Sequence, residues 1–273
     1  MSELTKMLSA NFTGLTNDQT YYARVYPMNR KGAAQSEIGT QIGSAILSAF
    51  PLEPITYNLI DTYSSSRTWV APEDGWFKIE AFGASGNGGN AALTEEDVWV
   101  DTGDGGVTPG YNLATGGGGA SGGYACSIVK MNKGDTVVLT RGAVGSTTKA
   151  VINSSLETYS QISITSGGNG GNATATSDSV IAGSAGTAGS VSGGNVVNTK
   201  GKNGSSGTYK RKANAGTTLS GGSGGAAVVT GANSGGNGAP IIAPTSTSCG
   251  VGAVGTGKNG FFKIYRGNTN VVA

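Results

Sequence analysis

The sequence contains no histidine, and this absence removes several kinds of chemistry at once. A Ser-His-Asp triad, a Cys-His dyad and a histidine-ligated metal centre are all excluded. Only two cysteines are present, Cys126 and Cys249, and they lie far apart in the chain with no CxxC spacing. Zinc binding is therefore not expected, and we favour two free, partly buried thiols over one disulfide.

Charge and long apolar runs are also scarce. Charged residues make up 12% of the chain, with a net charge of +2 and both signs interspersed, so no nucleic-acid-binding signature is present. No apolar run approaches the roughly 20 residues that span a membrane. The N-terminal residues MSELTKML lack the basic start and long apolar core of a secretory signal. We therefore expect a protein made in the cytoplasm without a signal peptide, which leaves the cell by lysis.

Glycine is abundant instead, with 49 residues among 273 against an average usage of about 7%. In three tracts glycine recurs at every third position: at Gly83, Gly86 and Gly89, at Gly183, Gly186 and Gly189, and at Gly201, Gly204 and Gly207. Three is the period of a polyproline-II-type helix, which rises about 3.1 Å per residue and has no internal hydrogen bonds. Such helices pack closely where the inward position has no side chain, and their backbone groups bond to neighbouring helices. The sequence therefore predicts a bundle of polyglycine-II helices.

A flexible glycine–serine linker is the alternative interpretation of these tracts. Apolar pairs such as Val180-Ile181, Val228-Val229 and Ile241-Ile242 interrupt the glycines, and strand-like segments enclose them at both ends. A tether needs neither feature, so we favour the bundle.

Four segments have the pattern of β-strands: DGWFKIEAFG (74–83), YACSIVKM (124–131), TVVLTRG (136–142) and NGFFKIYRG (259–267). The first and last share a glycine, two aromatic residues, a lysine and an isoleucine, so we expect them to be paired or equivalent strands of one β-sandwich. The predicted fold class is therefore mainly β, with sandwich strands that enclose the glycine bundle in a domain spanning 62–273.

The first 45 residues differ in character. Two strand-like runs, FTGL (12–15) and TYYARVYP (20–27), place Tyr21 six residues after Leu15, as in a tyrosine corner. We interpret 1–45 as a partial fibronectin type III-like segment, with a short β-segment packed on the main domain as the alternative. Two prolines within 46–61 indicate a linker that runs into the first strand of that domain.

The order of strand, glycine tract and turn carries a resemblance. TWVAPEDGWFKIEAFGASGNGG (68–89), GGGGASGGYA (116–125) and KGDTVVL (133–139) resemble the glycine-rich domain of bacteriophage tail proteins and tail-fibre adhesins. The resemblance covers about 55–270. It implies bundled polyglycine-II helices, sandwiched with β-strands, whose exposed loops bind a receptor on the host surface. A fibronectin-like segment is common upstream of such domains in phage and prophage tail proteins, which favours the phage interpretation.

One stretch, GVGAVGTGKNGFFKIYRG (250–267), matches a phosphate-binding loop in part. Gly252, Gly257 and Lys258 fit the first seven positions of GxxxxGK[ST]. The motif requires Ser or Thr next and then a helix, whereas Asn259 and a strand follow here. We therefore expect no nucleotide and no other cofactor, and we interpret the stretch as the end of a glycine tract, a turn and a closing strand.

The acidic stretch TEEDVWVDTGDGG (94–106) holds Glu95, Glu96, Asp97, Asp101 and Asp104 near glycines. A solvated loop is the interpretation we favour. A cation site at Asp101 and Asp104 is one alternative. A glycan depolymerase that uses the acidic loop 95–104 is another, because paired carboxylates hydrolyse glycosides.

Aromatic residues within the glycine-rich segments suggest recognition. Rigid aromatic rings on loops rich in Ser, Gly and Asn provide contact area at low entropic cost, and they stack on sugars. Three basic residues next to Tyr209 suit anionic groups of a cell envelope. The candidate receptor-binding residues are Trp99, Tyr111, Tyr159, Tyr209, Lys210, Arg211 and Lys212. The alternatives are that the aromatics cap the bundle or pack in the core, and that 210–212 is only a solvated turn.

Together these features predict a non-enzymatic phage or prophage tail adhesin. Its expected partners are a bacterial surface glycan or protein and other tail proteins, in the virion tail. A spacer module that binds only other tail proteins is the structural alternative.

Overall fold

The structure is a computed structural model, and it describes residues 21–24, 46–49, 55–101, 107–156, 158–159, 161–245 and 250–268. The chain divides into two compact units: Met1–Thr56 with Thr269–Ala273, and Tyr57–Asn268. Twenty strands and no helix occur in the described ranges, so the prediction of a mainly β fold is confirmed. No helix in this part of the chain is long and apolar enough to cross a membrane.

The first unit contains one strand pair in its described residues. Strands β1 (Tyr21–Arg24) and β2 (Ile46–Ala49) pair antiparallel, with Tyr21 opposite Ala49. The FTGL run lies outside the described residues, so the fibronectin-like segment stays a prediction. The second unit begins at Tyr57, within the stretch 46–61 that we interpreted as a linker.

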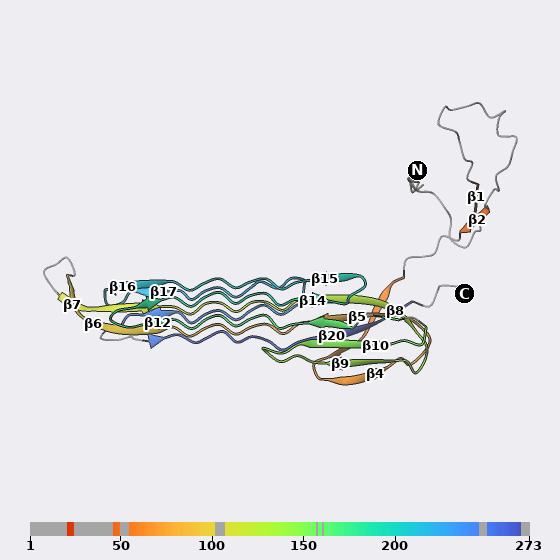
Figure 1. The fold of residues 1–273 in the computed structure, drawn as a ribbon, viewed down its shortest axis with the longest axis horizontal. Helices are drawn as coiled ribbons and strands as arrows, with labels where there is room; N and C mark the ends of the chain where they lie inside the picture. The colour runs from red at the N-terminus through yellow and green to blue at the C-terminus, as the bar shows by residue number, and fades with distance from the viewer. Residues whose placement is uncertain are drawn as a thin grey trace, which may run out of the picture. The chain divides into compact units, whose positions relative to one another are not determined.

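At one end of the second unit, two five-stranded antiparallel sheets pack on each other (Figure 1). The first sheet has the order β15 (Val197–Thr199), β8 (Tyr124–Met131), β5 (Gly75–Phe82), β20 (Phe261–Gly267) and β3 (Tyr57–Tyr63). The second has the order β14 (Val191–Ser192), β11 (Ile162–Ile164), β10 (Thr148–Asn153), β9 (Thr136–Thr140) and β4 (Arg67–Val70). We call this part the sandwich.

Alternation along the strands builds the sandwich core. In β5, Phe77, Ile79 and Ala81 are fully buried and face the second sheet, because successive side chains of a strand point to opposite faces. The ring of Phe77 meets that of Trp69 edge to face, with centroids 5.1 Å apart. Strands β5 and β20 pair antiparallel with Ile79 opposite Ile264, which confirms the predicted pairing of DGWFKIEAFG with NGFFKIYRG.

A turn at 132–135 joins β8 to β9. Gly134 has a φ of 94°, a conformation that side-chain-bearing residues rarely adopt. The carboxylate of Asp135 accepts hydrogen bonds from the backbone N–H groups of Asn132 (2.8 Å) and Ser155 (3.0 Å). These bonds stabilise the charged form and lower the pKa of Asp135, so its carboxylate holds the turn closed.

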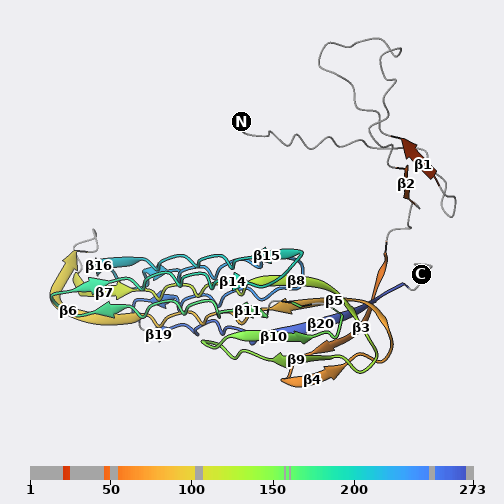
Figure 2. The ribbon, with the colours of Figure 1, turned by 45° about the vertical axis from the view of Figure 1, so that its right-hand side comes forward.

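Beyond the sandwich, eight extended glycine-rich segments run side by side to the other end of the unit (Figure 2). None of them forms a strand ladder. We call them together the bundle, and they are 83–91, 115–123, 165–173, 182–190, 200–208, 220–227, 232–240 and 252–260.

One segment, 115–123, lies at the centre and is fully buried. Its backbone bonds to six others: 83–91, 165–173, 182–190, 200–208, 220–227 and 232–240. These six segments form a ring around the central one, because each of them also bonds to the next. The bonds around the ring include Gly167 N to Ala84 O, Gly168 N to Thr187 O, Gly204 N to Gly186 O, Ser205 N to Ser223 O, Gly235 N to Gly225 O and Gly236 N to Gly86 O. The eighth segment, 252–260, bonds to 83–91 and 232–240 from outside the ring.

Hydrogen bonding of the central segment repeats every third residue. The N–H groups of Gly116, Gly119 and Gly122 donate to segment 232–240. Those of Gly117 and Ala120 donate to 165–173, and those of Gly118 and Ser121 donate to 200–208. Its carbonyl oxygens accept hydrogen bonds from the three remaining segments of the ring, 83–91, 182–190 and 220–227, again with a period of three residues. Nearly every buried polar group of this segment therefore has a backbone partner in another segment.

Glycine is required where segments touch. A Cβ atom on Gly86 or Gly186 would overlap the carbonyl oxygen of Gly168, and one on Gly204 would overlap that of Gly118. Five of the other six glycines in the three period-three tracts would overlap a carbonyl oxygen of a neighbouring segment in the same way, and the sixth, Gly83, would overlap the side chain of Ile164. These nine residues lie at the contacts between segments, or between the bundle and Ile164 in the case of Gly83.

Asparagine side chains complete the bonding. Asn169 and Asn172 accept from the backbone N–H groups of Asn87 and Asn90, each at 2.9 Å. Asn237 accepts from Gly224 N at 2.8 Å in the same way. A short amide side chain thus takes the place of a backbone carbonyl where the neighbouring segment presents none.

At the far end of the bundle the segments join short strands, which we call the tip (Figures 1 and 2). One three-stranded sheet has the order β16 (Tyr209–Ala213), β7 (Val107–Ala114) and β6 (Ala92–Asp101). A second has the order β17 (Thr218–Leu219), β18 (Ile241–Ile242) and β19 (Gly250–Val251). Strands β12 (Thr174–Ala175) and β13 (Val180–Ile181) form a two-stranded pair. Tyr111, Leu113, Ala213, Ile241 and Ala243 form a small separate core here.

Candidate functional site

Most of the residues that we predicted from the sequence to bind a receptor lie at the tip. Trp99 lies in β6, Tyr111 in β7 and the run 209–212 in β16, so one sheet carries them all. Tyr159 is the exception, because it packs against the sandwich core at the opposite end of the unit. The tip is therefore the candidate site, without Tyr159.

The structure corrects two details of this prediction. The candidates at the tip lie on strands, whereas we expected loops, because β6 and β7 pair as a hairpin with Glu95 opposite Tyr111. Tyr111 is also buried, packed with Leu113 and Ile241 in the small core, so its ring supports the tip and is not presented at its surface.

Strand β16 presents the candidates 209–212, and Trp99 is placed only by its strand, β6. Strand β16 lies at the edge of its sheet, and Tyr209 has 59% of its surface exposed. Lys210, Arg211 and Lys212 are also exposed, and none of the three forms an ion pair with Glu95, Glu96 or Asp178, the carboxylates of the tip whose side chains the structure describes. Arg211 Nη2 donates to the backbone oxygen of Asp178 at 3.0 Å. The edge strand is therefore a basic surface with one aromatic ring.

Asn112 holds this strand in shape, and no local pattern in the sequence indicates this role. It is fully buried in β7, where its side-chain oxygen accepts from Lys212 N at 3.2 Å. Its amide nitrogen donates to the Glu96 carboxylate and to the oxygen of Thr176, the latter at 2.9 Å. The bond to Lys212 coincides with a bulge in the β16–β7 pairing and with a φ of 48° at Lys212. One buried amide thus couples three parts of the tip.

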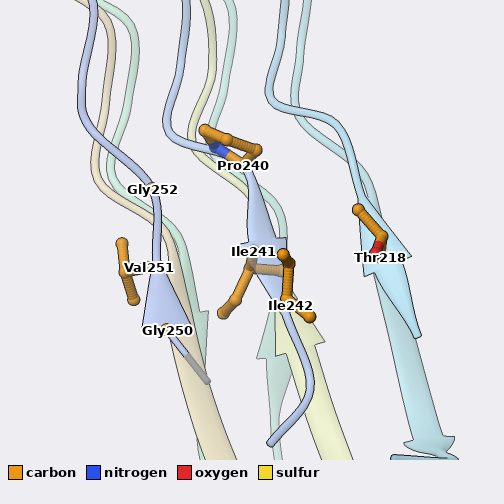
Figure 3. Close-up of a pocket in the computed structure, with 7 residues that line it drawn as sticks. All are labelled: Thr218, Pro240, Ile241, Ile242, Gly250, Val251 and Gly252. Carbon is orange, nitrogen blue, oxygen red and sulfur yellow. The ribbon is translucent and has the colours of Figure 1, made fainter. Parts of the chain in front are cut away.

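The second sheet of the tip contains a groove of about 340 Å³. Figure 3 shows β18 in the middle with β17 and β19 on either side. Its lining is formed by Thr218, Pro240, Ile241, Ile242, Gly250, Val251 and Gly252. Ile242 is 37% exposed and Val251 is 51% exposed, although both are large aliphatic residues. Sequence reasoning took Ile241-Ile242 only as an interruption of glycine and missed this groove.

Up to Asp101 the acidic stretch is a strand, whereas we expected a solvated loop. Residues 94–101 belong to β6, and Glu96 bonds to Asn112. Asp104 lies outside the described residues. Within the described part of the chain, no cluster of three or more Asp, Glu, Cys or His side chains could hold a metal ion. The cation site at Asp101 and Asp104 and the depolymerase, which requires only two carboxylates, therefore stay predictions.

The stretch that resembles a phosphate-binding loop uses its amides internally. Gly257 N donates to the side-chain oxygen of Asn87, and Lys258 N donates to Ser85 Oγ, both at 2.8 Å. Gly252 N donates to Pro240 O at 2.9 Å. A phosphate loop needs such amides free to face the anion. Here they attach segment 252–260 to the bundle.

A polar cluster lies on the outer face of the sandwich. The Glu80 carboxylate accepts from Tyr265 Oη at 2.8 Å and Tyr124 Oη at 3.0 Å, and it pairs with Lys78 Nζ at 3.0 Å. Burial tends to raise the pKa of Glu80, but these partners outweigh it and the pKa is lowered. Burial and the nearby carboxylate raise the pKa of both tyrosines. The neighbouring Cys126 is a buried free thiol whose pKa is raised by burial, and Cys249 lies outside the described residues.

We expect this cluster to make stability fall at acidic pH. The pKa of Glu80 is depressed in the folded state, so its contribution is present above the unfolded value, about 4.5, and is lost as the pH falls through the folded value. Glu80→Gln should lower the urea midpoint at neutral pH and flatten its dependence on pH between neutrality and about pH 3. Glu95→Gln, on an exposed carboxylate, is the control. Equal acid sensitivity in wild type and Glu80→Gln would refute the assignment.

Comparisons with protein-family models, with curated proteins and with solved structures gave no match for this chain.

Proposed function

We propose that this chain is a phage or prophage tail adhesin, in which a rigid glycine bundle presents the tip to a receptor on the bacterial surface. The observation that carries the proposal is the separation of roles along the second unit. One end is a closed sandwich, the middle is a bundle held by backbone bonds, and the other end exposes an aromatic ring, three basic residues and an apolar groove.

We further propose that the eight segments are polyglycine-II helices. The bonding of the central segment supports this assignment, because its N–H groups point to three neighbours in turn with a period of three. At about 3.1 Å per residue, nine residues such as 115–123 span about 28 Å. A bundle of this length sets the tip well clear of the sandwich.

A rigid binding surface favours adhesion because it is already ordered before the receptor binds. A surface that is already ordered does not lose conformational entropy when it binds, and more of its contact energy remains as affinity. The bonds of Asn112 and the small core hold β16 in one shape before any ligand arrives. In this proposal residues 1–45 are a partial fibronectin type III-like segment, and other tail proteins are expected partners of the chain.

Adsorption of the purified protein to bacteria tests the proposal. Fluorescently labelled protein should bind cells of at least one strain in a panel, and Tyr209→Ala should weaken this binding by about thirtyfold or more, as at an interface hot spot worth about 2 kcal/mol. Leu156→Ala, at an exposed position of the sandwich end, should bind as wild type does.

Two other results would redirect the assignment. Binding to tail proteins but to no cells would favour a spacer module. Release of sugars from host polysaccharide would favour a depolymerase. Unchanged adsorption of a folded Tyr209→Ala protein would exclude β16 from the contact.

A further inference from the structure

The pair Asn-Gly occurs five times in the sequence, and all five pairs lie in segments of the bundle. In each pair the side-chain oxygen of the asparagine accepts a hydrogen bond from a backbone N–H group of another part of the chain. The pairs and their donors are Asn87-Gly88 with Gly257 N (2.8 Å), Asn169-Gly170 with Asn87 N (2.9 Å), Asn203-Gly204 with Ala188 N (2.7 Å), Asn237-Gly238 with Gly224 N (2.8 Å) and Asn259-Gly260 with Val144 N (3.1 Å).

The glycine of each pair is held as well, because its N–H group donates to a backbone oxygen of a neighbouring segment or loop. These bonds are Gly88 N to Gly255 O, Gly170 N to Asn87 O, Gly204 N to Gly186 O, Gly238 N to Gly222 O and Gly260 N to Gly142 O. A Cβ atom on any of the five glycines would overlap a neighbouring atom. Packing therefore requires glycine at the second position of the pair, and the bridging bond requires an acceptor side chain at the first.

In a mobile chain, Asn-Gly is a sequence that readily loses ammonia. The glycine nitrogen gives its proton to a base and attacks Cγ of the asparagine, the bond between Cγ and the amide nitrogen breaks, and ammonia leaves as a five-membered succinimide forms. Water then opens this ring at either carbonyl and yields aspartate or isoaspartate. Glycine favours ring closure because it has no side chain to hinder the attack and leaves the backbone free to rotate.

Hydrogen bonds occupy both reacting groups in the folded bundle. Ring closure would have to break the bond of the glycine N–H group and the bond to the asparagine oxygen, and it would have to rotate a backbone that is fixed on its neighbours. The reaction can then proceed only in molecules in which the segment has opened. Its rate in the folded protein therefore falls with the population of that open state.

From this geometry we propose that the five Asn-Gly pairs are deamidation sites of the unfolded chain which formation of the bundle closes, so that the chain has a limited time in which it can fold. Aspartate at these positions still provides an acceptor oxygen for the bridging bond. Isoaspartate instead routes the main chain through Cβ and adds one atom to it, which shifts the later glycines of the segment away from their contacts. A chain that forms isoaspartate before it folds therefore cannot complete the bundle. The inference is independent of the proposed adhesin function.

Incubation of the full chain in mildly alkaline buffer, with and without guanidinium chloride, tests the protection. Peptide mass spectrometry should find deamidation at all five pairs in the denatured chain, and at least about hundredfold slower deamidation in the folded protein. Asn172 is the internal control, because it accepts the same kind of bond from Asn90 N but is followed by Ala173, so it should react slowly in both samples. Comparable rates at the five pairs in folded and denatured protein would overturn the inference.

Val144→Pro tests one pair by itself. Val144 and Gly145 are the central residues of a turn closed by Ser146 N to Ala143 O at 2.8 Å, and Gly145 has a φ of 83°. Proline suits the first central position of such a turn, so the substitution removes the N–H group that donates to Asn259 and keeps the turn. Deamidation at Asn259 should become about five- to tenfold faster, as for the loss of one hydrogen bond, while the other four pairs keep the wild-type rate.

Val144→Ala is the matched control, because it retains the N–H group and should leave the rate at Asn259 unchanged. If folded Val144→Pro deamidated at Asn259 no faster than Val144→Ala, the bonds of the pair would not be what protects it, and the inference would be overturned.

Refolding of aged chains tests the consequence for the bundle. Protein kept in guanidinium chloride until part of each pair has reacted should refold less completely than freshly denatured protein, and isoaspartate should be confined to the fraction that does not refold. Aspartate from the same reaction should appear in both fractions. Asn237→Asp, which keeps an acceptor for Gly224 N, should refold as the wild type does. Equal amounts of isoaspartate at the five pairs in the refolded and unfolded fractions would contradict the proposal.

Discussion

Replacing Gly186 by valine is expected to unfold the second unit, or to reduce its free energy of unfolding by about 4 kcal/mol or more. The new side chain would overlap the carbonyl oxygen of Gly168 and approach Ala120 N of the central segment at 2.7 Å. Gly186 N also donates to Gly118 O at 2.8 Å, and this bond would break when the segments move apart. The buried groups left without partners add their own cost. Circular dichroism during heating should show the melting temperature lowered by about 10 °C or more.

Thr187→Val is the matched control, because Thr187 lies next to Gly186 and is exposed. Its melting temperature should stay within a few degrees of wild type. If Gly186→Val also melted like wild type, the segments could not be packed as closely as described, and a flexible arrangement of the glycines would be the better interpretation.

Phe262→Ala is expected to have the second largest effect, a loss of about 3–5 kcal/mol in the free energy of unfolding. Phe262 is fully buried and lies in β20, the strand that pairs with both β5 and β3. Alanine would leave a cavity between the two sheets that rigid strands cannot fill. Chemical denaturation should report the loss as a lower midpoint with an unchanged slope.

The adjacent Phe261 provides the comparison. Its ring lies on the outer face, stacked on Phe82 with centroids 4.3 Å apart, and it is only partly buried. Phe261→Ala should cost about 1–2 kcal/mol, since it removes less buried area. Equal losses from the two substitutions would mean that β20 does not face the core as described.

The same pair of variants tests whether the sandwich and the bundle unfold together. Segment 252–260 runs directly into β20, and segments 83–91 and 115–123 adjoin β5 and β8. Because the chain passes between the two parts without a linker, we expect a single calorimetric transition for the second unit. Two separated transitions in Phe262→Ala would show that the bundle is stable without the sandwich.

Much of the sandwich could be predicted because its strands carry local signals. Alternating apolar residues identify β5 and β8, and the shared pattern around Phe77 and Phe262 indicates that two distant strands are related. The turn at 132–135 is readable because only a few residue types satisfy its geometry. These features depend on residues close together in the sequence.

The arrangement of the bundle could not be predicted in the same way. The spacing of glycines predicts close contact, but the tracts share one repeat, so nothing local says which neighbour each one bonds. The central segment even carries Ala120 and Ser121, which are fully buried there, in place of glycine. The central position of this segment depends on hydrogen bonds between residues as far apart in the sequence as Gly119 and Gly236.

The candidate site was predicted in part for a related reason. The aromatic and basic residues near Tyr209 stand out from their glycine-rich surroundings, and the structure places them on one edge strand. The burial of Tyr111 depends on Ile241, which is distant in sequence and belongs to another sheet. The groove arises from three strands of two residues each, too short to give any periodic signal.

The position of the central segment along the chain has a consequence for how long the fold lasts. Residues 115–123 are second in order among the eight segments, and five of their six neighbours are synthesised later. The ring closes only when 232–240 has emerged, so folding waits for contacts of long sequence separation and is slow. Unfolding must break the backbone hydrogen bonds among the ring segments before segment 115–123 is released. The lifetime of this protein among proteases is then set by a high barrier to opening, a kinetic stability measured as a half-life.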